Sequence, residues 1–181
     1  MSLENLVAAI RAKAAPGDMR TRIVAVDGPG GAGKSTLAQR LTEALGGAQI
    51  VTTDDFACWS NPLEWWPRVV EEVLEPLARG ERSRYRCSRW RPDQPEEWKE
   101  VAPAEFVVLE GVSASRAAFQ PYLTYSIWID TPRDVRLQRG LVRDGEEARG
   151  QWEEWMAQED AYVAHERPHE RADAVIRGDP A

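Results

Sequence analysis

Apolar runs and amphipathic stretches alternate along most of the chain. Short apolar runs predict strands near 22–27, 49–53, 106–110, 124–130 and 173–177. Segments with helical periodicity predict helices at 34–45, about 63–79, 114–120, 132–143 and 150–165, with a further amphipathic helix between Leu3 and Ala15. Strands that alternate with helices pair in parallel, because each crossover helix covers a face of the sheet. The pattern therefore predicts an α/β fold in which a parallel five-stranded sheet carries helices on both faces.

The first predicted strand leads directly into a glycine-rich loop. Residues Gly28-Pro29-Gly30-Gly31-Ala32-Gly33-Lys34-Ser35 match the pattern G-x-x-x-x-G-K-[ST], the Walker A motif or P-loop. Glycines let the backbone curl so that its N–H groups face phosphate oxygens, and the next helix points its positive end at the same anion. We therefore predict nucleotide contacts from the loop residues Gly28, Gly30, Gly31, Ala32 and Gly33. The flanking strand and helix disfavour the alternative, a glycine-rich turn that binds nothing.

Three side chains at the end of this loop suit a nucleoside triphosphate and its metal ion. Lys34 is expected to reach the β- and γ-phosphates as a point charge and to act in catalysis. The Ser35 hydroxyl is expected to bind Mg²⁺, and Thr36 could add a contact to the α-phosphate. ATP and Mg²⁺ are therefore the expected cofactors.

Carboxylates follow two further strands, at the edge of the sheet where ligands bind in such folds. Asp54 and Asp55 follow the second predicted strand, and Glu110 ends the third. Asp54 is the candidate base that orients an acceptor hydroxyl and takes its proton. Together with Ser35 and Glu110 it is also a candidate ligand of Mg²⁺. The alternatives are that Asp54 or Asp55 caps the next helix and that Glu110 has no role.

The predicted helix 132–143 carries a stripe of arginines. Arg136, Arg139 and Arg143 are three and four residues apart and therefore share one face. Glycines near the end of this helix suit a small mobile lid over about 139–150. We expect Arg139 and Arg143 to neutralise charge in the transition state and Arg136 to contact the nucleotide. The alternative is a solvated face paired with the acidic residues that follow, Glu146, Glu147, Glu153 and Glu154.

Composition limits the class of protein. The 181 residues, 43% hydrophobic and 29% charged, fit one domain over 1–181. A net charge of −7 argues against nucleic acid as a partner, and no apolar run approaches the length of a membrane span. Cys58 and Cys87 are too few for a disulfide framework, so we expect reduced thiols and a cytoplasmic location. A chain of this size is compatible with a monomer or a homodimer.

These motifs together resemble the uridine kinase branch of P-loop kinases, which also includes pantothenate kinase and phosphoribulokinase. The resemblance is carried by residues 23–36, 51–56, 107–111, 136–144 and 172–176, the last of which match the family's final strand beside the adenine. It implies a three-layer P-loop NTPase fold and ATP- and Mg²⁺-dependent phosphorylation of a small-molecule hydroxyl. Asp54 matches the family's catalytic aspartate, and Arg139 and Arg143 match its lid arginines. Gly140 stands where the family often has a second arginine, a departure that would loosen the lid.

The chain departs further from this family in the expected acceptor-binding segment, over about residues 56–100. Ser60 stands where nucleoside-binding members carry an aspartate for the ribose hydroxyls, in the run Trp59-Ser60-Asn61-Pro62. Tyr85-Arg86 stands in place of a Tyr-Asp pair, and Trp90 stands where a histidine would face the base. The resemblance therefore does not identify the acceptor.

Tryptophans occupy this segment instead. Five of the chain's eight lie between residues 59 and 98, namely Trp59, Trp65, Trp66, Trp90 and Trp98, and Trp152 and Trp155 follow the lid. With neighbouring arginines they could form a pocket that stacks a flat acceptor or grips an anionic one. The alternative is that Trp65 and Trp66 pack a helix against the sheet while the others cover apolar surface.

The sequence thus predicts a kinase that transfers the γ-phosphate of ATP to a hydroxyl of a nucleoside-like or other small molecule. A nucleoside monophosphate kinase is an alternative that the arginines favour and Asp54 disfavours, since a phosphate acceptor needs no base. A non-catalytic nucleotide-binding regulator is a second alternative, which rests on Gly140 and the altered acceptor motifs.

Overall fold

A five-stranded parallel sheet forms the centre of the molecule. The computed structural model describes residues 1–178. The strand order is β2-β5-β1-β6-β7, and all four neighbouring pairs are parallel. The bounds are Arg22–Asp27 (β1), Gln49–Thr52 (β2), Phe106–Glu110 (β5), Leu123–Asp130 (β6) and Ala174–Arg177 (β7). The five strands predicted from the apolar runs are confirmed.

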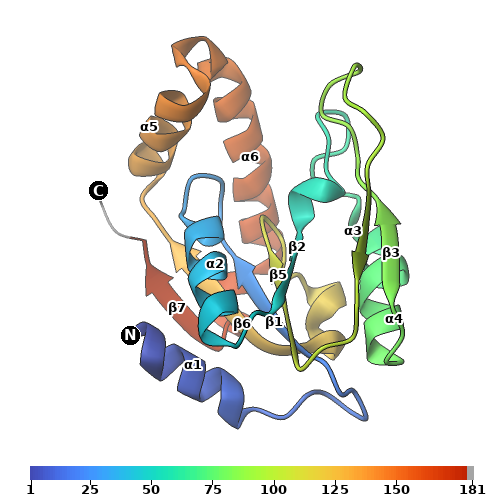
Figure 1. Cartoon of the computed structure of the whole chain (residues 1–181). Helices are drawn as coiled ribbons and strands as arrows, with labels where there is room; N and C mark the ends of the chain where they lie inside the picture. Colours follow the sequence, from blue (N-terminus) through green and yellow to red (C-terminus); the bar gives the residue numbers. More distant parts are fainter. Residues whose placement is uncertain (179–181) are drawn as a thin grey trace.

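Two helices cover one face of this sheet, α1 (Leu3–Ala12) and α2 (Lys34–Ala44). Their apolar stripes supply Leu6, Ile10 and Leu41, which pack against Val24 and Val26 of β1. The central strand β1 is buried from Ile23 to Asp27, because helical layers cover both of its sides. The amphipathic helix expected near the N-terminus is therefore α1, and it covers the lower part of the sheet (Figure 1).

A second helical layer covers the opposite face. One helical segment runs through α3 (Trp66–Val69), the π-helical turn η2 (Val70–Leu74) and α4 (Glu75–Ala78), and the 3-10 helix η3 (Ala117–Tyr122) lies beside it. The π turn precedes Pro76, which has no N–H to donate to the carbonyl of Glu72; the Ser83 hydroxyl donates to that carbonyl instead, at 2.7 Å. The helices expected at about 63–79 and 114–120 are thus present with shifted bounds.

A β-hairpin stands outside the sheet and was not predicted. Strands β3 (Ser83–Arg86) and β4 (Trp98–Val101) pair antiparallel, in a part of the chain for which the sequence pattern predicts no strand. Tyr85 packs against Phe56 with ring centroids 4.7 Å apart. Its hydroxyl donates to Asp55 at 3.0 Å, and the Lys99 ammonium donates to the same carboxylate at 2.8 Å. The hairpin is therefore held against the 3-10 turn η1 (Thr53–Asp55) that follows β2.

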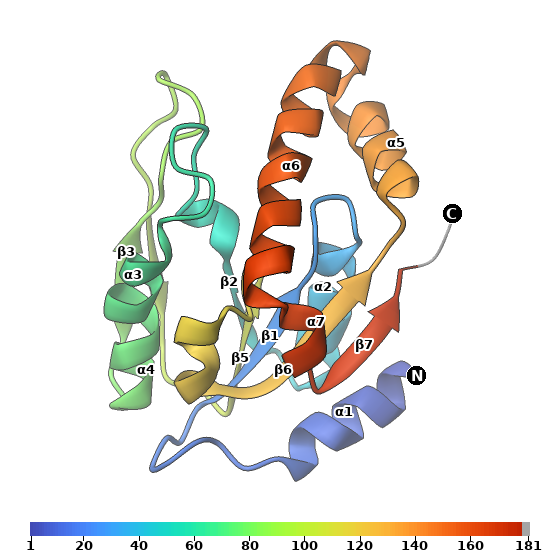
Figure 2. The ribbon, with the colours of Figure 1, turned by 180° about the vertical axis from the view of Figure 1, so that it is seen from behind.

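Two arms rise beyond the carboxyl ends of the strands. One consists of α5 (Arg133–Asp144), the 3-10 turn η4 (Glu146–Ala148) and most of α6 (Arg149–Glu166); the other contains the loop before α3 and the tip of the hairpin (Figures 1 and 2). A short helix, α7 (Pro168–Arg171), returns the chain to β7. In residues 1–178 no helix combines the length and the apolar character needed to cross a membrane.

Candidate functional site

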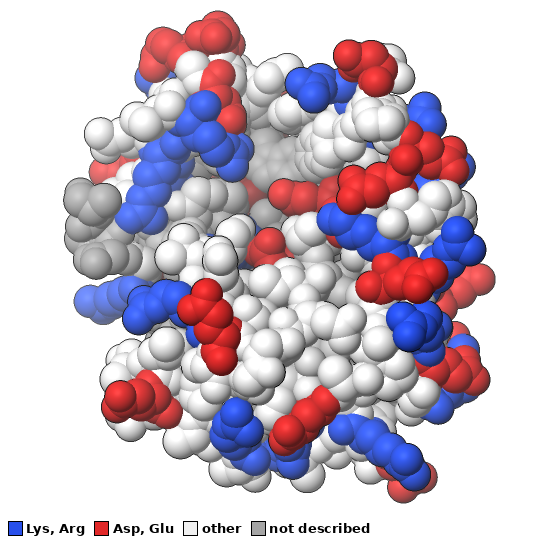
Figure 3. Space-filling view, in the orientation of Figure 1, with Lys and Arg blue, Asp and Glu red and all other residues white. Residues whose placement is uncertain are grey.

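A cavity of about 930 Å³ lies between the two arms, above the carboxyl ends of β1 and β5. The hollow is visible at the top of the space-filling view (Figure 3). Most residues predicted for the site line it, namely Gly30, Gly31, Ala32, Gly33, Lys34, Ser35, Thr36, Asp54, Glu110, Arg139 and Arg143. Residues 176–178, at and after the end of β7, also line it, as expected for the family's final strand. Two predicted contact residues, Gly28 and Arg136, are not part of its lining.

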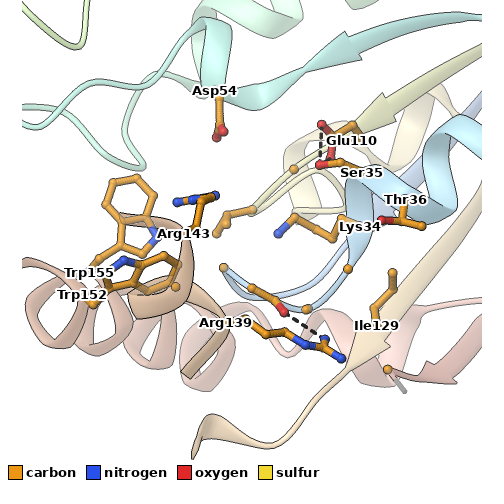
Figure 4. Close-up of a pocket in the computed structure, with 18 of the residues that line it drawn as sticks. Lys34, Ser35, Thr36, Asp54, Glu110, Ile129, Arg139, Arg143, Trp152 and Trp155 are labelled. Carbon is orange, nitrogen blue, oxygen red and sulfur yellow. Dashed lines mark hydrogen bonds between the residues drawn. The ribbon is translucent and has the colours of Figure 1, made fainter. Parts of the chain in front are cut away.

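The P-loop connects β1 to α2 with the backbone that its glycines allow. Gly33 precedes the first residue of α2 in a left-handed conformation, at φ 99°. Gly28 has a different reason to be glycine, because a Cβ there would lie 2.7 Å from the carbonyl oxygen of Ile129 in β6. Gly28 thus lets β6 approach the loop and does not itself face the cavity. The Lys34 ammonium points into the cavity and donates to the Pro29 carbonyl at 2.9 Å (Figure 4).

Ser35 and Glu110 lie together on the floor of the cavity. The Ser35 hydroxyl is 3.4 and 3.5 Å from the two carboxylate oxygens of Glu110 (Figure 4). Burial raises the pKa of Glu110, while the nearby Lys34 charge acts to lower it. Among residues 1–178, no cluster of three or more His, Cys, Asp or Glu side chains could hold a metal ion by itself. One hydroxyl and one or two carboxylates fit Mg²⁺, which takes its other ligands from water and phosphates.

Asp54 faces this floor from the other side of the cavity. Its carboxylate projects from η1 toward the space between Lys34 and Arg143 (Figure 4). The walls of the cavity reduce its hydration and raise its pKa, whereas the charges of Lys34 and Arg143 act to lower it. Neither carboxylate of the pair caps α3, because that helix begins after Trp65 without a side-chain cap. Asp55 instead accepts from Tyr85 and Lys99. The two neighbouring aspartates therefore have different surroundings, and only Asp54 reaches the cavity.

The arginine stripe of α5 divides between the cavity and the protein interior. The Arg139 guanidinium donates to the Gly31 carbonyl of the P-loop at 3.2 Å. The Arg143 guanidinium makes two hydrogen bonds of 2.7 Å to Asp144 and lies 5.4 Å from the ring centre of Trp152. Arg143 thus pairs with its neighbour and not with the acidic residues of η4 and α6. Both arginines reach the region where the predicted lid would close.

Arg136 is buried, and its predicted contact with the nucleotide is not supported. Its guanidinium donates to Glu159 of α6 at 3.2 Å and to the Thr131 carbonyl at 3.1 Å. The side chains of Arg136 and Glu159 are only 6% and 2% exposed. The other carboxylate oxygen of Glu159 accepts from the Gly30 N–H at 2.7 Å and from the Trp155 indole at 2.6 Å. Arg136 therefore acts on the P-loop indirectly, through Glu159, which the sequence analysis did not single out.

Gly140 allows α5 and α6 to pack closely. A Cβ at this position would lie 2.3 Å from a ring atom of Trp152, which is buried between the two helices. The Trp152 indole also donates to Asp144 at 2.9 Å. The close approach of this indole ring leaves no room for a side chain at position 140, and the contact joins α5 to α6.

Replacing Gly140 with alanine is expected to destabilise the protein by overpacking. We expect the free energy of unfolding to fall by about 1–3 kcal/mol, and the melting temperature to fall by about 2–4 °C for each kcal/mol. Gly150→Ala is the matched control, since a Cβ there meets nothing within 4 Å and alanine favours the helix. Thermal melts should therefore show a lower midpoint for Gly140→Ala alone; equal midpoints would contradict this packing.

The tryptophans divide into core and cavity residues. Trp65 is 2% exposed and packs in the core beneath α3, with Trp66 partly buried beside it. Trp98 lies on the outer face of the hairpin. Trp59 and Trp90 instead line the cavity together with Trp152 and Trp155 of α6. The packing interpretation is thus confirmed for Trp65 and Trp66, and the second group lines the same cavity as Asp54 and the P-loop.

Asp27 is a further residue that the sequence analysis did not single out. It ends β1, is fully buried, and accepts hydrogen bonds from the backbone of Gly28 and Ser113 and from the Tyr162 hydroxyl, at 2.7 to 2.9 Å. The backbone and hydroxyl of Ser115 donate to it as well. One carboxylate thus joins the start of the P-loop to α6 and to the loop after β5. The sequence feature that could have indicated this role is an acid directly after the apolar run of residues 23–26.

Comparisons with known proteins bear on the fold. No protein-family model matches the chain. The bifunctional pantoate ligase/cytidylate kinase of Gloeobacter violaceus is 44% identical over 63 residues, which are 35% of this chain and 11% of that protein. The chain thus spans a small part of that longer protein.

Two solved structures are similar over nearly the whole chain. A Bacillus stearothermophilus protein, provisionally assigned as a uridine kinase, has a TM-score of 0.69 at 19% identity, covering 96% of each chain. A Silicibacter sp. TM1040 protein, provisionally assigned as a fructose transport system kinase, has a TM-score of 0.69 at 22% identity, covering 97% of this chain and 98% of its own. The chain has the P-loop NTPase fold. The resemblance to the uridine kinase branch is confirmed at the level of the fold.

Proposed function

We propose that the protein is an ATP- and Mg²⁺-dependent kinase that phosphorylates a hydroxyl of a small molecule. The observation that carries the proposal is that Asp54 faces Lys34 and the P-loop across a single cavity. Phosphoryl transfer needs a phosphate cradle and a carboxylate that orients the attacking hydroxyl, on opposite sides of the reacting phosphate. Asp54 lies on η1 and the P-loop connects β1 to α2, an arrangement that supports this proposal.

Each part of the site then has a role in the transfer. The P-loop backbone from Gly30 to Gly33 and the start of α2, with Thr36, would hold the phosphates. Lys34 would bind the β- and γ-phosphates, and Arg139 and Arg143 would neutralise the charge that develops during transfer. Ser35 and Glu110, with Asp54, would hold Mg²⁺, which supplies charge compensation when bound. Asp54 would orient the acceptor hydroxyl and take its proton.

A nucleoside monophosphate kinase is the second candidate, favoured by the short similarity to a protein that includes a cytidylate kinase. An acceptor phosphate needs cationic partners of its own, whereas the acceptor side of this cavity carries tryptophans, and Arg143 is already assigned to the transferred phosphate. The hydroxyl acceptor therefore accounts better for the residues present.

The proposal is tested by ADP release from ATP and Mg²⁺ across a panel of alcohols, sugars, nucleosides, pantothenate and nucleoside monophosphates. We expect one class of hydroxyl compound to stimulate release, and we expect Lys34→Ala to abolish that stimulation because the β- and γ-phosphates lose their cationic partner. Calorimetry with ATP completes the test. ATP binding without stimulation by any compound would instead favour the nucleotide-binding regulator.

A further inference from the structure

Three tryptophans form a packed cluster on the acceptor side of the cavity. The ring centroids of Trp59 and Trp90 are 5.3 Å apart, those of Trp90 and Trp155 5.8 Å, and those of Trp59 and Trp155 6.1 Å. At these distances the rings touch one another, so no ligand fits between them. The cluster therefore offers its outer ring surface to the cavity, and it joins both arms of the molecule, since Trp155 belongs to α6.

The indole N–H groups of two of these three tryptophans are already used. The Trp90 indole N–H donates to the backbone carbonyl of Asp54 at 3.0 Å, and the Trp155 N–H donates to Glu159 at 2.6 Å. What remains for a ligand is mainly the ring surface of Trp59, which is 54% exposed, together with the indole N–H of that residue. A molecule that lies against it gains by stacking and by apolar contact and cannot replace many hydrogen bonds to water.

The groups that would bind a nucleoside through its sugar are missing or occupied. Ser60, at the position of the ribose-binding aspartate, does not line the cavity. The Tyr85 hydroxyl donates to Asp55, and Trp90 replaces the histidine. The nearby charges of Arg143 and Asp144 pair with each other. With Arg143 assigned to the transferred phosphate, this side of the cavity favours a planar ring over a sugar or an anion.

The Trp90 hydrogen bond sets the distance between the cluster and the candidate base. Because Trp90 is bonded to the backbone of Asp54 itself, the ring surface begins beside the residue that would take the acceptor proton. A ligand whose ring stacks on the cluster can therefore present a hydroxyl to Asp54 only through a short linker between the ring and the hydroxyl.

We propose that the acceptor is an uncharged aromatic or heteroaromatic alcohol, with a planar ring stacked on Trp59, Trp90 and Trp155 and a hydroxymethyl-type group at Asp54. This inference rests on the proposed kinase function. The acceptor oxygen would form a bond to the γ-phosphorus, while the bond from that phosphorus to the β–γ bridging oxygen breaks. ADP leaves with the electron pair, and Asp54 takes the hydroxyl proton.

The test compares ring and non-ring acceptors in matched variants. ADP release is measured with benzyl alcohol, hydroxymethylpyridine and hydroxymethylpyrimidine against cyclohexylmethanol, glucose and uridine. Trp59→Ala is the test variant, and Trp98→Ala is its control, because the two indoles are 54% and 50% exposed and only Trp59 lines the cavity. We expect the aromatic alcohols to stimulate release, and Trp59→Ala to raise their KM by about tenfold, as for loss of one stacking partner. The KM for ATP and the behaviour of Trp98→Ala should not change.

The outcomes separate this inference from the proposed function. Stimulation by glucose, uridine or cyclohexylmethanol equal to that by the aromatic alcohols, with no effect of Trp59→Ala, would overturn the aromatic acceptor and leave the kinase standing. If no compound stimulates release, the kinase proposal fails, and the aromatic site is tested by binding alone. Saturable quenching of tryptophan fluorescence by hydroxymethylpyrimidine that is lost in Trp59→Ala and kept in Trp98→Ala would support the site. Absence of saturable quenching would overturn it.

Discussion

Asp54→Asn is expected to lower the turnover number by about 10²–10⁴-fold while ATP still binds. Asparagine keeps the shape of the side chain, but it cannot take the proton of an acceptor hydroxyl. The phosphate cradle lies across the cavity on the β1–α2 loop and does not depend on this side chain. Steady-state ADP release with the stimulating acceptor measures the first effect, and calorimetry with ATP measures the second.

The same substitution also decides between the two kinase candidates. A nucleoside monophosphate acceptor attacks through a phosphate oxygen that carries no proton at neutral pH, so it needs no base. Turnover that is nearly unchanged in Asp54→Asn would therefore contradict a hydroxyl acceptor and favour the phosphate acceptor. Loss of ATP binding would show that the role of Asp54 in holding the Mg²⁺ of the nucleotide, and not proton transfer, accounts for the lost turnover.

The pKa of Asp54 gives this prediction a pH dependence. Burial raises that pKa above the ordinary value of 3.8, and the base must be ionised to act. We therefore expect kcat/KM to fall on the acid side with an apparent pKa above 3.8, and we expect Asp54→Asn to remove that limb. A profile whose acid limb is the same in both proteins would contradict the assignment.

The melting temperature of Asp54→Asn shows whether this variant keeps its fold. A carboxyl whose pKa is higher in the folded than in the unfolded state binds more protons when folded, so its contribution to stability falls as pH rises through that interval. At neutral pH the ionised Asp54 therefore costs stability. Asp54→Asn should melt at the same temperature as the parent protein or higher, which separates loss of turnover from loss of fold.

The sheet and the P-loop could be predicted because short segments determine them. Strands β1 and β5 are continuous apolar runs, as burial on both faces requires, and the phosphate loop is one contiguous motif. Once a parallel sheet was predicted, residues after the strands had to meet at one edge, which placed Asp54 and Glu110 near Lys34. This part of the site follows from topology.

The hairpin and the tryptophan cluster depend on contacts between distant segments. Strand β4 lies in a charged stretch that follows two prolines, and Asp55 holds it through Lys99, which is 44 residues away. The cluster joins Trp59 and Trp90 to Trp155 on another arm. No local pattern in the sequence indicates such pairs.

The separate roles of the three arginines of α5 could not be predicted either, because they too depend on contacts with a distant segment. Helical spacing places Arg136, Arg139 and Arg143 on one side of α5, but it does not tell which of them meets α6. The structure buries Arg136 against Glu159 and leaves Arg139 and Arg143 at the cavity. Glu159, a buried acid on α6, determines that Arg136 faces the protein interior.

Arg136→Met is expected to cost about 3–5 kcal/mol of unfolding free energy, because Glu159 would keep a buried charge without its cationic partner. For a chain of this length the melting temperature should fall by roughly 10 °C. Arg133→Met, one turn earlier on α5, is the control, since Arg133 and its partner Asp160 are both about half exposed. Exposed pairs of this kind contribute at most about 1 kcal/mol, so that variant should melt nearly as the parent does.

A double variant tests whether the uncompensated charge is the cause. In Arg136→Met with Glu159→Gln, the buried pair is neutral, and the glutamine oxygen can still accept from the Gly30 N–H and the Trp155 indole. We therefore expect this protein to be more stable than Arg136→Met alone, with the Gly30 N–H held in both variants. A direct contact of Arg136 with the nucleotide would give the opposite pattern: a small change in melting temperature, weaker ATP binding, and no rescue by Glu159→Gln.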